Sequence, residues 1–114
     1  AKSTMTGTVA GTPQYMAPEQ EEGVVRAESD VFSMGAMLYE MVTGQRPYPA
    51  AATTASKINK RYEKPSRLAA DLPPALEELI IQCLEPDPEK RPRSAAEFRA
   101  RLDALKASVP AKTG

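Results

Sequence analysis

The 114-residue sequence contains no histidine and no tryptophan, and it has a single cysteine, Cys83. One cysteine cannot form a disulfide within the chain, and because Cys83 lies among apolar residues we expect a buried, unreactive thiol. No apolar run approaches the roughly 20 residues that a membrane span needs. Fifteen basic and fifteen acidic residues cancel, so the net charge favours neither nucleic acid nor an anionic membrane surface. We therefore expect a cytoplasmic domain that contacts neither nucleic acid nor membrane.

Hydrophobic periodicity predicts an all-α chain. Residues about 29–43 are apolar on nearly every side of a helical wheel, and Gly44 supplies a left-handed helix end. This pattern predicts a central helix buried inside the protein. Late helices are expected over about 75–106, because Ser94 and Glu97 form a capping box there. Ahead of that box, apolar residues recur at helical spacing at Leu76, Leu79, Ile80, Cys83 and Leu84.

The remaining segments carry weaker patterns. Residues 1–14 show no period and predict a loop. Pro18 suits a first helical position and Gly23 suits a helix end, so a short helical turn is expected between them. A modest helix is expected over 50–64, a loop over 65–74, and a tail or linker over 107–114.

Four motifs follow one another along the chain. They are GTPQYMAPEQ at residues 11–20, SDVFSMG at 29–35, GQRPY at 44–48 and CLEPDPEKRP at 83–92. Each is similar to a motif of eukaryotic-type Ser/Thr protein kinases, in the same order, from the end of the activation segment onward. The resemblance extends over residues 1 to about 106 and is nearest to the bacterial branch of that family.

The resemblance implies a fold and an activity. Residues 1–106 would be part of a protein kinase domain: the helical C-terminal lobe, preceded by an activation-segment loop at residues 1–20. The intact protein would transfer the γ-phosphate of ATP, with Mg²⁺, to hydroxyl groups of protein substrates. The pair Gly11 and Thr12 favours serine or threonine as the acceptor.

The catalytic motifs of that family are missing from this chain. Without histidine there is no H-R-D catalytic loop, and neither Phe32 nor Phe98 stands in a D-F-G sequence. Residues 7–11 lack the spacing and the lysine of a phosphate-binding glycine loop. We therefore expect this chain to bind no ATP and no metal, and to need the remainder of the kinase domain. The alternative is a non-catalytic helical protein-interaction module, either a truncated product or a pseudokinase piece.

The resemblance also implies a substrate-docking segment near the N-terminus. Thr12 would support catalysis by placing the substrate hydroxyl, with a turn threonine before Pro13 as the alternative. Tyr15 and Met16 are as consistent with packing as with substrate contact. The full set of expected substrate-binding residues is Gly11, Thr12, Pro13, Gln14, Tyr15, Met16 and Ala17.

Other residues are assigned regulatory or structural roles by the resemblance. Thr4 and Thr6 are candidate phosphorylation sites, with a flexible Ser/Thr loop as the alternative. Glu19 and Arg91 would form a buried ion pair that ties the activation segment to the late helices, unless both are solvated. Asp30 would anchor the absent catalytic loop, and its carboxylate also suits the first turn of a helix.

Overall fold

A computed structural model describes residues 13–49 and 52–108. The regular secondary structure in these ranges is all helical, so the predicted all-α fold is confirmed. In chain order the elements are η1 (Pro13–Tyr15), η2 (Pro18–Glu22), α2 (Ala27–Thr43), α3 (Thr54–Ile58), α4 (Pro65–Leu68), α5 (Pro74–Cys83), η3 (Pro88–Lys90) and α6 (Ala95–Ser108), where η denotes a 3-10 helix.

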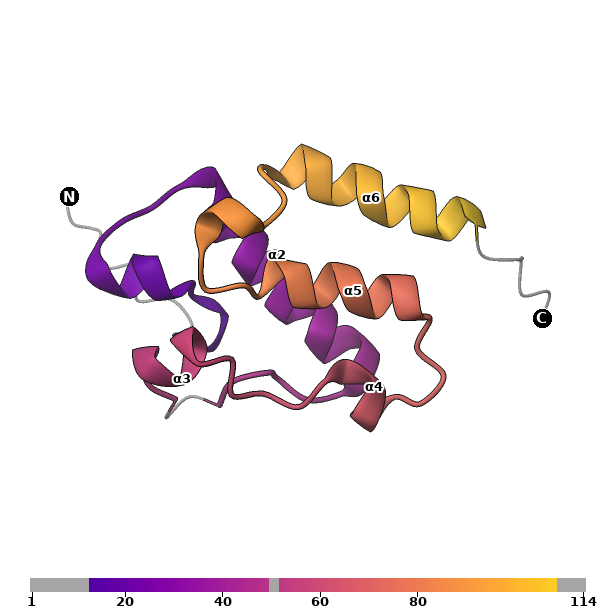
Figure 1. The fold of residues 1–114 in the computed structure, drawn as a ribbon, viewed down its shortest axis with the longest axis horizontal. Helices are drawn as coiled ribbons and strands as arrows, with labels where there is room; N and C mark the ends of the chain where they lie inside the picture. Colours follow the sequence, from indigo (N-terminus) through magenta and orange to yellow (C-terminus); the bar gives the residue numbers. More distant parts are fainter. Residues whose placement is uncertain (1–12, 50–51, 109–114) are drawn as a thin grey trace.

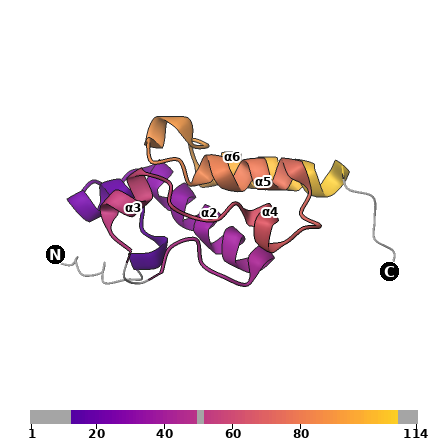
Figure 2. The same cartoon turned by 60° about the horizontal axis from the view of Figure 1, so that its bottom comes forward.

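Helix α2 is the centre of the arrangement. Helices α5 and α6 run side by side in opposite directions, and α2 crosses behind α5 in Figure 1. In Figure 2, α5 and α6 overlap in the view and lie above α2 and α4. Segments η1, α4, α5 and α6 all contact α2, so residues distant in sequence are held together through this one helix.

The ends of α2 follow local capping rules. The Ser29 hydroxyl accepts a hydrogen bond from the backbone N–H of Arg26 at 3.0 Å, and Glu28 and Asp30 lie in the first turn, where the helix dipole favours negative charge. Gly44 ends the helix with φ of 80°, a conformation that costs glycine little. The helix begins at Ala27, two residues before the predicted start.

Most sides of α2 are buried, but one face is not. Phe32 and Tyr39 are nearly inaccessible, whereas Met37 is 46% exposed and Met41 is 79% exposed. Burial of this helix is therefore incomplete among the described residues, on the face that carries these two methionines. The physical reason is that no described element packs over this uncovered face of α2 (Met37 and Met41).

Close packing between α2 and α5 depends on Gly35. A Cβ atom added to Gly35 would lie 2.3 Å from the Cβ of Cys83, a separation that forces the two helices apart. Gly35→Ala is therefore expected to lower the free energy of unfolding by about 1–3 kcal/mol, despite the better helix propensity of alanine. Urea unfolding of the variant measures this change. Met41→Ala, on the uncovered face, is the control and should change stability by less than about 0.5 kcal/mol; equal effects would contradict the packing role.

The second layer is a helical pair. Val31, Leu79 and Cys83 form a buried cluster, against which Phe98 and Leu102 of α6 pack. At the start of α6 the backbone N–H of Glu97 donates to the Ser94 hydroxyl at 3.1 Å. The carboxylate of Glu97 accepts from the N–H of Arg93, so one half of the predicted capping box forms and the reciprocal bond reaches the residue before Ser94. Helix α6 continues two residues into the predicted tail of 107–114.

The connection from α2 to α5 differs from the sequence prediction. The helix expected over 50–64 is confined to α3, which Thr53 caps by accepting from the N–H of Ser56. The loop expected over 65–74 contains α4, because Pro65 provides the fixed φ of a first helical position. None of the helices in residues 13–49 and 52–108 has the length and apolar content that crossing a membrane requires.

Candidate functional site

The predicted docking segment enters the structure at Pro13. Four expected site residues (Gly11, Thr12, Thr4 and Thr6) lie outside the described residues. The described part comprises η1 and the two residues after it, and together with η2, which follows, it runs along the side of the helical body. Within it, the side-chain oxygen of Gln14 is buried and has no hydrogen-bond donor among the described residues.

Tyr15 fastens the start of this segment to the middle of α2. Its hydroxyl donates to the carboxylate of Glu40, and its backbone carbonyl accepts from the Ser33 hydroxyl at 2.6 Å. The guanidinium of Arg46 lies 6.0 Å from the centre of the Tyr15 ring. Tyr15 is half-buried and packs against the main core cluster, so its contacts support the packing alternative at this position.

Glu19 and Arg91 lie in direct contact, although 72 residues separate them in sequence. The two guanidinium nitrogens of Arg91 donate to the two carboxylate oxygens of Glu19, at 2.8 Å and 2.9 Å. The side chain of Arg91 is fully buried and that of Glu19 is 11% exposed. This bidentate geometry is the strongest that a guanidinium and a carboxylate can form.

Every N–H group of the Arg91 side chain has an acceptor. Besides the carboxylate of Glu19, the guanidinium donates to the backbone carbonyl of Glu28 at 2.9 Å. It also donates to the carbonyls of Glu85 at 2.7 Å and Pro86 at 3.2 Å. One buried charge therefore joins η2, the first turn of α2 and the loop after α5.

The environment of Glu19 favours its charged form. Burial alone would raise the pKa of Glu19, but hydrogen bonds from Arg91 and from the Ser29 hydroxyl outweigh it. The Ser29 hydroxyl donates at 2.6 Å. The net result is a pKa below the ordinary glutamate value of 4.5, so at neutral pH the carboxylate is available to the guanidinium.

Acidification is expected to remove the stabilisation that Glu19 provides. Because the pKa is lowered on folding, the unfolded state binds the proton more tightly. The contribution is thus complete above the ordinary value of 4.5 and is lost as pH falls through the lowered folded value. Unfolding free energies of wild type and Glu19→Gln, measured from about pH 7 to about pH 3, should converge as pH falls. A difference that stays constant over this range would show that the Glu19 charge contributes nothing.

On the other side of η2, Glu21 contacts α3. Its carboxylate accepts from the Thr54 hydroxyl and from the Lys57 ammonium, the latter at 2.5 Å. Lys57 also donates to the backbone carbonyl of Met16 at 2.8 Å. Sequence reasoning missed Lys57 because one lysine in a polar segment carries no signal of burial. Between Glu19 and Glu21, the side chain of Gln20 accepts from the N–H of Ala17 at 2.9 Å.

The remaining predicted residues have simpler surroundings. Asp30 is exposed on the first turn of α2, and its carboxylate has no partner among the described residues. Cys83 is fully buried. Burial raises the pKa of its thiol to about 12, and the positive charges of Arg101 and Arg91 offset this only in part. The expected unreactive character of Cys83 agrees with this environment.

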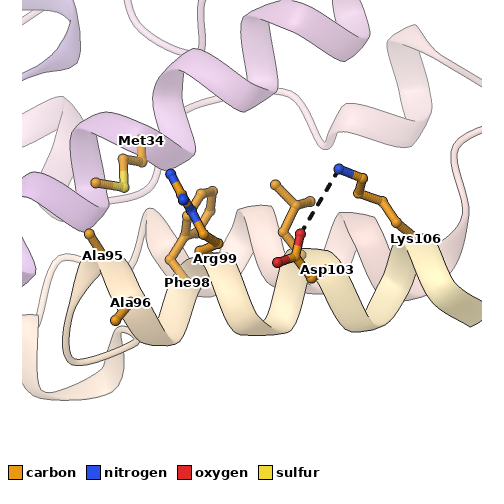
Figure 3. A pocket seen from close by; sticks show the side chains of 8 residues that line it. Met34, Ala95, Ala96, Phe98, Arg99, Asp103 and Lys106 are labelled. Atoms are coloured by element: carbon orange, nitrogen blue, oxygen red, sulfur yellow. Dashed lines mark ion pairs between the residues drawn. The ribbon is translucent and has the colours of Figure 1, made fainter.

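The structure also has an open groove between α2 and α6, of about 610 Å³. In Figure 3, Met34 of α2 faces the N-terminal half of α6, with Phe98 beside it. Asp103 and Lys106 pair at 3.9 Å toward the other end. None of the residues predicted from the sequence to form a site lines this groove.

Comparison with known proteins gives matches along most of this chain. A family model described as "Protein kinase domain" matches residues 1–101. The serine/threonine-protein kinase PknB of Mycolicibacterium smegmatis is 40% identical over 103 residues, which is 87% of this chain and 16% of that protein. PknA of Mycobacterium tuberculosis is 44% identical over 108 residues, which is 94% of this chain and 25% of that protein. The chain therefore spans a quarter or less of the length of these two relatives.

Proposed function

The chain belongs to the protein kinase domain family, and from this premise we propose that it is part of a serine/threonine kinase. The intact protein transfers the γ-phosphate of ATP to hydroxyl groups of protein substrates. A cytoplasmic location accords with this use of ATP. The observation that carries the proposal is the bidentate contact between Glu19 and Arg91, because it holds the segment that precedes α2 firmly on the helical body.

Within this function the chain supplies the surface that receives the protein substrate. Phosphoryl transfer depends mostly on positioning and charge neutralisation, so a rigid docking segment contributes directly to the rate. Residues 13–17 form the described part of this surface, and we assign Gly11 and Thr12 to the same substrate-binding set. We assign Thr12 the role of orienting that hydroxyl, and Thr4 and Thr6 the role of phosphorylation sites.

The nucleotide site lies in the remainder of the kinase domain. Residues 13–49 and 52–108 contain no group of three acidic, histidine or cysteine side chains that could hold a metal ion. The sequence contains no glycine loop and no H-R-D or D-F-G motif. We therefore assign the binding of ATP and Mg²⁺ to the remainder of the kinase domain. Asp30, exposed at the start of α2, is assigned to contact the missing catalytic loop.

The test is a phosphoryl-transfer assay on the full-length polypeptide that contains this segment, with casein as a generic substrate. Thr12→Ala is expected to lower kcat/KM about 100-fold, the loss typical of a misplaced reactant, while Thr12→Ser keeps the hydroxyl and most of the activity. The isolated chain should show no heat of ATP binding by calorimetry. An inactive full-length protein, or Mg²⁺-dependent micromolar ATP binding by the isolated chain, would overturn the proposal; inactivity would favour the protein-interaction module.

A further inference from the structure

Lys57 is the most deeply buried lysine among the described residues, with only 2% of its side chain exposed. It lies on α3, a five-residue helix, yet its ammonium reaches the docking segment. The ammonium donates to the carbonyl of Met16, 41 residues earlier, and to the carboxylate of Glu21, 36 residues earlier. A buried charge persists only where such partners are supplied.

Helix α3 contacts η2 through two side chains on one face. Thr54 and Lys57 are three residues apart, so their side chains project from the same side of the helix. Both side chains donate to the carboxylate of Glu21. Thr53 caps the start of this helix by accepting a hydrogen bond from the N–H of Ser56. The positions of Thr54 and Lys57 are therefore well defined.

The contact with Met16 differs in kind from the contact with Glu21. Glu21 lies in η2, beyond the residues expected to meet the substrate, whereas Met16 lies among them. Its carbonyl is held by a charged donor at 2.8 Å, a stronger hydrogen bond than a neutral donor forms. The peptide plane between Met16 and Ala17 is thereby oriented, and with it the backbone that presents the neighbouring side chains.

We propose that Lys57 is a positioning residue for substrate docking: its ammonium holds the Met16 carbonyl and so sets the shape of the surface that receives the protein substrate. This inference rests on the proposed kinase function. It does not make Lys57 a catalytic residue, because Lys57 acts through Met16. The expected signature is a loss confined to the protein substrate, with the handling of ATP unchanged.

The experiment measures steady-state kinetics on the full-length protein for wild type, Lys57→Met and the double variant Lys57→Met/Glu21→Gln. Lys57→Met is expected to lower kcat/KM for casein about tenfold and to leave KM for ATP unchanged. The double variant removes both charges, so thermal stability should recover toward wild type while kcat/KM for casein stays low, because Met16 still lacks its donor. Lys60→Met is the matched control, since Lys60 forms a surface pair with Glu85, and it should resemble wild type.

Recovery of stability and kinetics together in the double variant would show that Lys57 serves only to balance Glu21, and would overturn the proposal. Equal losses toward ATP and casein would do the same. Amide hydrogen exchange supplies a readout that needs no catalysis: Lys57→Met should exchange faster than Lys60→Met at residues 14–22, with α5 unchanged. An inactive wild type would end the kinase proposal and leave this exchange test standing, whereas unchanged exchange in an active protein would end the Lys57 proposal alone.

Discussion

Replacing Arg91 by methionine is expected to lower the free energy of unfolding by about 3–5 kcal/mol, the cost typical of leaving one member of a buried ion pair alone. The side chain of Arg91 is fully buried, and methionine has comparable length but no donor. The substitution leaves the carboxylate of Glu19 and three backbone carbonyls without their hydrogen-bond donor. Urea unfolding of the kinase domain, followed by far-UV circular dichroism, measures the change.

Two further variants sharpen this prediction. Arg93→Met changes the same residue type two positions away, on the surface, and should cost less than about 0.5 kcal/mol. Arg91→Lys keeps the charge but offers a compact ammonium in place of the planar fork, so it should recover only part of the loss. Full recovery with lysine would show that charge matters here and that bidentate geometry does not.

The second large effect is expected at Phe32. Its side chain is fully buried and stacks on Tyr48, with ring centres 6.5 Å apart. The guanidinium of Arg91 lies 5.0 Å from the centre of the ring. Phe32→Ala should therefore lower the free energy of unfolding by about 3–5 kcal/mol, combining lost burial with the cavity left behind. The same unfolding experiment measures it.

Phe32→Leu separates volume from aromatic character. Leucine refills most of the cavity but gives Arg91 no aromatic face, so the expected cost is about 1–2 kcal/mol, of which a contact between cation and ring accounts for roughly half. A leucine variant as unstable as the alanine variant would mean that the ring contacts dominate. An alanine variant within about 1 kcal/mol of wild type would contradict the placement of Phe32 in the core.

Local patterns predicted much of the fold because local physics decides it. Gly44 ends α2 with the left-handed conformation expected there. Pro18 and Gly23 bound a helical turn, as their backbone preferences require. The regular spacing of apolar residues predicted α5 because that helix buries one stripe on α2. For Gly44, Pro18 and Gly23 the decisive interaction lies within a few residues of the pattern, whereas for α5 the spacing of the apolar residues carries the signal.

What could not be predicted depends on contacts between distant residues. Nothing near Lys57 in sequence indicates that its ammonium meets Met16 and Glu21. From the sequence alone, Gly35 is a residue of low helix propensity inside a helix. Its packing role depends on Cys83, which lies against it in the fold. The sequence does not indicate which face of α2 is uncovered, because apolar character is a property of the sequence, whereas burial is a property of the neighbouring elements. The pairing of Glu19 with Arg91 was reached through motif resemblance and not through spacing.

The most direct test of the account is a double-mutant cycle on Glu19 and Arg91 in the kinase domain. It measures the unfolding free energies of wild type, Glu19→Gln, Arg91→Met and the double variant. Because the two side chains share two short hydrogen bonds, the account predicts a coupling energy of about 2 kcal/mol or more. Costs that add to within about 0.5 kcal/mol would mean that the two residues act independently, and that this pair does not hold η2 to the loop after α5.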